Sequence, residues 1–148
     1  MTPPTRLNWF ATTGWEGVVN YCATILGRSP TPDERMKLAA ALFRECFEPN
    51  MIVRLADVAE TTGDPAFLHL ASRHHDWQVR VASIANGSLG PARVAAMSFD
   101  PDPSVRAAAL RSPHRDPGLV DRVLAGLDPT VADLLGIDFI EDLRAGVH

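Results

Sequence analysis

The sequence is poor in several residue types whose abundance would point to a function. Lys37 is the only lysine, and the net charge is −4. This balance argues against indiscriminate nucleic-acid binding, because such binding depends on neutralising phosphates. Cys22 and Cys46 are the only cysteines, and they form neither a C-x-x-C pair nor a zinc-ligand spacing. We interpret them as buried thiols of a cytoplasmic protein and expect no bound metal.

Long apolar runs and catalytic motifs are also lacking. No stretch approaches the ~20 apolar residues that cross a bilayer, so we expect no membrane span. Residues 1–6 contain no basic run followed by an apolar core, so we expect no secretory signal. The sequence contains no nucleophile–base pair, no phosphate-binding glycine loop and no metal triad. It therefore predicts a non-enzymatic protein with no catalytic residues and no cofactor.

The most informative feature is a repeat with a period of 26 residues. Each of its four copies has valine at the fourth position, and three copies begin with aspartate. Arginine follows the valine in every copy except the last. The copies cover residues 50–56, 76–82, 102–108 and 128–134. A fixed period in this range is typical of stacked-repeat proteins.

A second marker recurs at the same interval, about halfway between the first blocks. It is a proline preceded by a helix-capping residue, at Asp64–Pro65, Gly90–Pro91 and Asp116–Pro117. Proline is tolerated at the first helical position because the N–H group it lacks has no helical partner there. The predicted caps of the first set are Asn50, Asp76, Asp102 and Asp128. The predicted helices cover residues 51–61, 65–73, 77–86, 91–98, 103–111, 117–126, 129–136 and 138–146.

The first third of the chain predicts two longer helices. Thr13 and Glu16 form a capping-box pattern that opens a helix ended by Gly27. A second capping box, which begins at Thr31, opens a helix that stops before Pro49. The predicted apolar face of the first helix consists of Trp15, Val18, Val19, Cys22, Ile25 and Leu26. That of the second consists of Leu38, Ala39, Leu42, Phe43, Cys46 and Phe47.

The repeat unit resembles the HEAT-like repeats, and most closely their leucine-rich repeat variant, whose units begin with Val-Arg and alternate two short helices. The pairs Val53-Arg54, Val79-Arg80 and Val105-Arg106 carry this resemblance. It implies a right-handed α-solenoid of short helix pairs that serves as a scaffold for protein partners. We therefore predict an all-α protein with one domain over residues 1–148.

The predicted domain has a cap at each end. The two longer helices, in residues 8–48, form the N-terminal cap, and four repeats follow in residues 50–148. The last repeat closes the stack with apolar residues beneath a polar outer face, which terminal repeats need. The apolar residues are Phe139, Ile140 and Leu143, and the acidic ones are Asp133, Asp138, Glu141 and Asp142.

Arginine and aspartate recur in register and form a predicted ladder. One interpretation is functional, with a row of guanidinium groups facing a phosphate or an acidic partner. The other is structural, with each arginine paired to a repeated carboxylate in its own or the next unit. Ala132 replaces arginine where no further repeat follows, which favours the structural interpretation. The ladder consists of Arg54, Asp76, Arg80, Asp102, Arg106 and Asp128.

A cluster around Trp77 is the candidate binding surface for a protein partner. Trp77 occupies a first helical position that the two later copies give to Pro103 and Pro129. Tryptophan is a favoured interface anchor, although this one could instead pack over the preceding loop. The adjacent histidines lack the i, i+4 spacing of a helical zinc site. The candidate partner-binding residues are Arg73, His74, His75, Trp77 and Arg93.

An alternative function is regulatory binding of nucleic acid. Arginines are concentrated in the middle repeats, but aspartates are interleaved with them. A row of Arg73, Arg80, Arg93 and Arg106 along one open surface would favour this alternative.

Overall fold

The computed structural model describes residues 6–113, 115, 118, 121 and 124–145. All regular elements within these ranges are α-helices, so the prediction of an all-α protein is confirmed for this part of the chain. The chain divides into two compact units, Met1–Asn86 and Gly87–His148. Each unit has its own core of buried apolar side chains.

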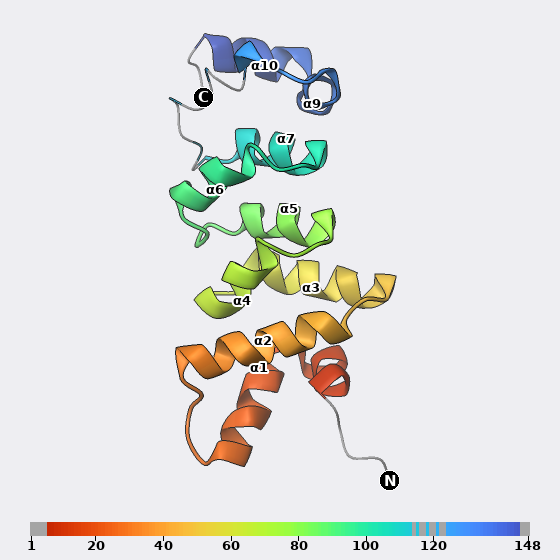
Figure 1. The fold of residues 1–148 in the computed structure, drawn as a ribbon, viewed down its shortest axis with the longest axis vertical. Coiled ribbons are helices and arrows are strands. Elements are labelled where there is room, and N and C mark those ends of the chain that lie inside the picture. Colours follow the sequence, from red (N-terminus) through yellow and green to blue (C-terminus); the bar gives the residue numbers. More distant parts are fainter. Residues whose placement is uncertain (1–5, 114, 116–117, 119–120, 122–123, 146–148) are drawn as a thin grey trace. The chain divides into compact units, whose positions relative to one another are not determined.

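The first unit consists of five helices in its described part (Figure 1). They are α1 (Arg6–Leu26), α2 (Pro32–Glu45), α3 (Pro49–Thr61), α4 (Pro65–Ala71) and α5 (Trp77–Ala85). Helix α3 packs against α5, and α2 packs against α4. The ring of Phe67 lies between those of Trp15 and Phe43, with 5.0 Å between ring centroids in both pairs. The buried side chains of all five helices therefore form a single core.

A buried carboxylate ties the N-terminal helices to α4. Asp64 caps α4 by accepting a hydrogen bond from the main-chain N–H of Ala66 at 3.0 Å. Its other oxygen accepts one from the indole Nε1 of Trp15 at 2.8 Å and one from Arg35 at 3.2 Å. The predicted cap is thus confirmed, and it also holds α1 and α2 in place.

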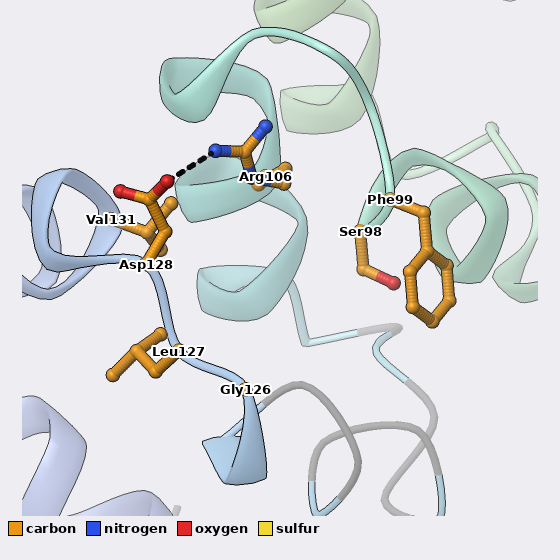
Figure 2. Close-up of a pocket in the computed structure, with 7 residues that line it drawn as sticks. All are labelled: Ser98, Phe99, Arg106, Gly126, Leu127, Asp128 and Val131. Carbon is orange, nitrogen blue, oxygen red and sulfur yellow. Dashed lines mark hydrogen bonds and ion pairs between the residues drawn. The ribbon is translucent and has the colours of Figure 1, made fainter.

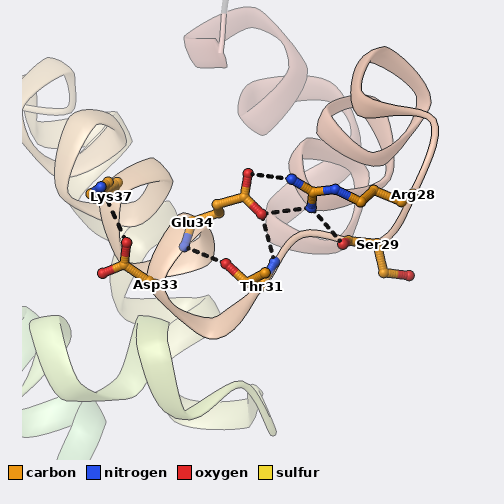
Figure 3. A network of polar contacts seen from close by, with 6 residues as sticks. All are labelled: Arg28, Ser29, Thr31, Asp33, Glu34 and Lys37. Atoms are coloured by element: carbon orange, nitrogen blue, oxygen red, sulfur yellow. Dashed lines mark hydrogen bonds and ion pairs between the residues drawn. The ribbon is translucent and has the colours of Figure 1, made fainter.

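The start of α2 confirms its predicted capping box. The hydroxyl of Thr31 accepts from the main-chain N–H of Glu34 at 3.2 Å, and the Glu34 carboxylate accepts from that of Thr31 at 3.0 Å. Arg28 adds a two-pronged ion pair to Glu34 at 2.7 and 3.1 Å (Figure 3). Hydrogen bonding from Arg28 lowers the pKa of Glu34 to about 2. The Glu34 carboxylate is therefore charged at any physiological pH.

Helix α1 departs from its predicted start. It begins at Arg6 and contains a kink at Gly14, where φ is 72°. This left-handed conformation suits glycine, and it places Thr13 before the kink. The kink divides α1 into two helical segments, and the second begins just after Gly14, one residue beyond the predicted cap Thr13. The helical segment before the kink was not predicted. The predicted end is confirmed, because α1 stops at Leu26 and Gly27 has a φ of 71°.

Three predicted core residues of the first unit are exposed instead. Helix α2 ends at Glu45, so Phe47 lies beyond the helical face and is 72% exposed. Ile25 and Leu26 lie in the last turn of α1 and are also exposed. Cys46 is fully buried, and burial raises the pKa of its thiol to about 11. Cys22 is only half-buried, so one of the two predicted buried thiols is confirmed.

Helix α3 begins one residue before the predicted cap. Its N-cap is Glu48 and Pro49 occupies the first turn, so Asn50 lies inside the helix. The prediction that Asn50 is a cap is wrong, because Pro49 offers a helix start two residues before the predicted one. This shift has consequences for Arg54, which are described below.

The second unit contains α6 (Pro91–Met97), α7 (Pro103–Arg111), α9 (Pro129–Leu135) and α10 (Ile137–Arg144) in its described part. Helix α7 packs against α6 and α9, and α9 packs against α10. Ile140 and Leu143 are buried, whereas the four acidic residues of the predicted polar face are exposed. The predicted helix over 117–126 and its Asp116–Pro117 start lie largely outside the described residues.

Candidate functional site

Two side chains hold the turn before α5, that of the helix cap Asp76 and that of Arg80 in the helix. Asp76 caps α5 by accepting from the main-chain N–H of Gln78 at 2.8 Å. One turn later, Nη1 of Arg80 reaches back to the main-chain carbonyls of His74 at 2.7 Å and His75 at 2.9 Å. A charged donor that bonds two carbonyls fixes the path of the turn.

The same arrangement recurs at the start of α7. Asp102 accepts from the N–H of Ser104 at 2.8 Å. Nη1 of Arg106 donates to the carbonyls of Asp100 at 2.7 Å and Pro101 at 3.0 Å. Nη2 of Arg106 also contacts Asp128 at 3.4 Å. The predicted pairing of an arginine with the next carboxylate is thus present here, but the shortest bonds go to main-chain carbonyls, which the sequence did not predict.

Arg54, the first member of the predicted ladder, has no such role. Its side chain is exposed and makes no hydrogen bond or ion pair with any described residue. Because α3 starts at Pro49, the carbonyl of Glu48 already accepts from the N–H groups of Met51 and Ile52. The first unit therefore has no turn before α3 that Arg54 could hold in the way Arg80 holds the turn before α5.

His74 lies inside the first unit, where a protein partner could not contact it. Its side chain is 5% exposed, and its ring meets the edge of Phe43 at 5.3 Å between centroids. Its Nδ1 accepts from the main-chain N–H of Asp76 at 3.0 Å. Its Nε2 has no hydrogen-bond partner in the described structure. Burial lowers the pKa of His74 to about 4, so the imidazole is neutral at pH 7.

The other candidate residues on this turn are exposed. Trp77 is 41% exposed. His75 is exposed and stacks on the buried His74 ring, with 4.3 Å between centroids. The guanidinium of Arg73 donates to the carbonyl of His69 at 3.0 Å. Arg93 lies on α6 in the second unit and is half-buried. The structure therefore brings Arg73, His75 and Trp77 together around one clamped turn of the first unit.

A second candidate site is a pocket in the second unit, which the sequence did not predict. It has a volume of about 160 Å³ and is open on one side. Figure 2 shows the Arg106–Asp128 contact at the pocket and the ring of Phe99, which is 60% exposed. The pocket is lined by Ser98, Phe99, Arg106, Gly126, Leu127, Asp128 and Val131. A signal for it exists in the repeat, because Phe99 occupies the position that Arg73 has one period earlier.

Among the residues that the structure describes, no three His, Cys, Asp or Glu side chains are placed to hold a metal ion. None of the helices in the described ranges has the length and apolar character that a membrane span requires.

Comparisons with known proteins add no family to these observations. Neither protein-family models, nor curated proteins, nor solved structures give a match to this chain.

Proposed function

We propose that this protein is a non-enzymatic interaction module that binds a cytoplasmic protein partner, and that the turn carrying Trp77 is its main contact. The proposal includes the finer architecture, a right-handed solenoid of the HEAT-like or leucine-rich repeat variant type. Two observations support that architecture. Helices begin at Trp77, Pro103 and Pro129, one period apart, and Arg80 and Arg106 clamp equivalent turns in the two units.

The exposed indole of Trp77 is the observation that carries the proposed function. The later helices α7 and α9 begin with proline at the equivalent position, so the helix start does not require an aromatic side chain. A half-exposed tryptophan on a turn clamped by hydrogen bonds is pre-organised for binding, because little side-chain freedom remains to be lost. Tryptophan is also among the residues that contribute most to interfaces.

The hydrogen bonds of the arginines favour a protein partner over nucleic acid. Arg73, Arg80 and Arg106 each donate to main-chain carbonyls of their own unit. Guanidinium groups engaged in this way have fewer donors left for phosphates. The two free cysteines are consistent with a cytoplasmic location.

Affinity capture followed by a binding measurement tests this proposal. The protein captured from native cell extract is purified, and its affinity for the wild type is compared with that for Trp77→Ala. We expect Trp77→Ala to weaken binding by about thirtyfold, the effect of an interface hot spot. The control is Phe47→Ala, which removes an even more exposed aromatic from the same unit and should leave the affinity unchanged.

Two outcomes would contradict the proposal. Equal affinity for wild type and Trp77→Ala would remove Trp77 from the interface. Capture of nucleic acid, with binding lost as salt rises, would instead support the alternative regulator.

A further inference from the structure

The pocket in the second unit has the size of one side chain. Its volume of about 160 Å³ is close to that of cavities that hold a benzene ring. Phe99, Leu127 and Val131 supply its apolar surface. Because the Phe99 ring is largely exposed, an apolar group that enters the pocket would remove this surface from water and gain free energy.

The opposite side of the pocket presents a guanidinium and a carboxylate that are joined by one long hydrogen bond. Nη2 of Arg106 and Oδ2 of Asp128 are 3.4 Å apart, which is longer than the about 2.7–2.9 Å of a strong charge-assisted bond. The other groups of both side chains are engaged within the described unit. Nη1 of Arg106 bonds two carbonyls, and Oδ1 of Asp128 accepts from the N–H of Thr130 at 2.7 Å. The Asp128 carboxylate is also hydrogen-bonded by the Thr130 side chain and by the main chain of Val131.

This pair matches the polar groups of a peptide main chain. Each peptide residue offers one N–H donor and one C=O acceptor, so Asp128 can accept from the former while Arg106 donates to the latter. A carboxylate ligand fits less well, because Asp128 would repel it beside the same guanidinium. Hydrogen bonding from Thr130 lowers the pKa of Asp128, which keeps that carboxylate charged at neutral pH.

We infer that the pocket binds one aromatic or branched apolar side chain of an extended peptide segment, whose main chain is hydrogen-bonded by Arg106 and Asp128. This inference rests on the proposed function, since it assigns the pocket to a segment of the protein partner. It also adds a second contact that does not involve Trp77.

Nuclear magnetic resonance titration of the full chain with capped amino acids tests the inference. The probe is N-acetyl-phenylalanine methylamide, which carries an aromatic side chain between two peptide groups. The matched probe is N-acetyl-alanine methylamide, which has the same peptide groups and no ring. We expect the first probe to cause saturable shifts of the Leu127 and Val131 methyl signals at millimolar concentration, and the second to cause none.

Two variants and two controls assign the binding to the pocket. Phe99→Ala removes the exposed wall, and Asp128→Ser removes the acceptor while keeping an equally good helix cap. Each should weaken binding of the phenylalanine probe by about fivefold or more, the effect of a lost hydrogen bond or ring contact. Phe47→Ala and Asp133→Ser remove an exposed ring and an exposed carboxylate that do not line the pocket. Both controls should leave binding unchanged.

Three outcomes would overturn the inference: no saturable shift, equal shifts with both probes, or unchanged affinity in Phe99→Ala and Asp128→Ser. Its failure is distinguishable from failure of the proposed function. The titration uses no partner protein, whereas the capture experiment depends on Trp77 and not on the pocket.

Discussion

The buried imidazole of His74 accepts a hydrogen bond from the main-chain N–H of Asp76 at 3.0 Å. One period later, the carboxylate of Asp100 accepts the equivalent bond from Asp102 at 2.9 Å. In both turns the side chain two residues before the cap is the acceptor, and in the first unit this acceptor is a titratable ring. If Nδ1 of His74 were protonated, its N–H group would face the main-chain N–H of Asp76, and two donors would oppose each other.

The first prediction concerns the pH dependence of stability. The pKa of His74 is lowered from 6.5 to about 4 in the folded protein, chiefly by burial, with a further contribution from His75. The unfolded chain therefore binds a proton more readily than the folded one between these values. Stability is complete above pH 6.5 and falls as the pH drops towards 4, by about 3 kcal/mol in total for a shift of this size.

Urea unfolding between pH 4 and pH 7 measures this effect, with His74→Asn as the control. The amide oxygen of asparagine can accept the same bond from Asp76, but the side chain does not titrate. We expect the variant to lose less stability than the wild type as the pH falls through this interval. Identical slopes for the two proteins would show that His74 does not carry the effect.

A second prediction tests the clamp of Arg106 against the exposed Arg54. Arg106→Ala removes two short bonds to carbonyls and the contact with Asp128, so we expect a loss of about 1.5–3 kcal/mol of unfolding free energy. Arg54→Ala removes the same group from the same repeat position without breaking any bond to a described residue. Its effect should lie within about 0.5 kcal/mol. Chemical denaturation of both variants makes the comparison, and equal losses would contradict the clamp.

A third prediction concerns the buried carboxylate of Asp64. Asp64→Ala leaves Arg35, the Trp15 indole and the Ala66 N–H without their acceptor. We expect a loss of about 3–5 kcal/mol, as when a buried ion pair loses one partner. The control is Asp128→Ala, which removes an exposed cap and should cost about 1 kcal/mol. Calorimetric melting distinguishes the two, and a small effect at Asp64 would mean that water replaces the carboxylate.

The helix starts were predictable from the sequence because their signals are local. At Asp64–Pro65, Asp102–Pro103 and Asp128–Pro129, aspartate caps a helix and proline occupies its first turn, so this signal lies in two adjacent residues. The error at Asn50 has the same cause, since Pro49 supplies a competing start that the repeat alignment concealed. Phe47 is exposed because α2 ends at Glu45, before it reaches this residue. The end of that helix depends on tertiary packing, so the sequence did not indicate it.

The candidate sites were less predictable because they depend on contacts between elements. The repeated arginines were identified, but their main-chain acceptors lie in loops whose path no sequence pattern specifies. His74 was predicted as a partner contact because histidine is usually at least partly exposed, and its burial against Phe43 could not be read from its neighbours. The pocket combines residues from the end of α6, the start of α7 and the start of α9, so only the folded unit reveals it.

The buried thiol of Cys46 can report when the core of the first unit becomes accessible to solvent. Alkylating reagents attack the thiolate, and a thiol with a pKa of about 11 inside a core is almost never in that form. The rate at which Cys46 is labelled therefore measures the frequency with which the core of the first unit opens to solvent. The segment from Gly87 onward has no cysteine and contributes nothing to this signal. Labelling at Cys46, set beside the loss of total helix content, reveals whether the two halves of the chain unfold as one.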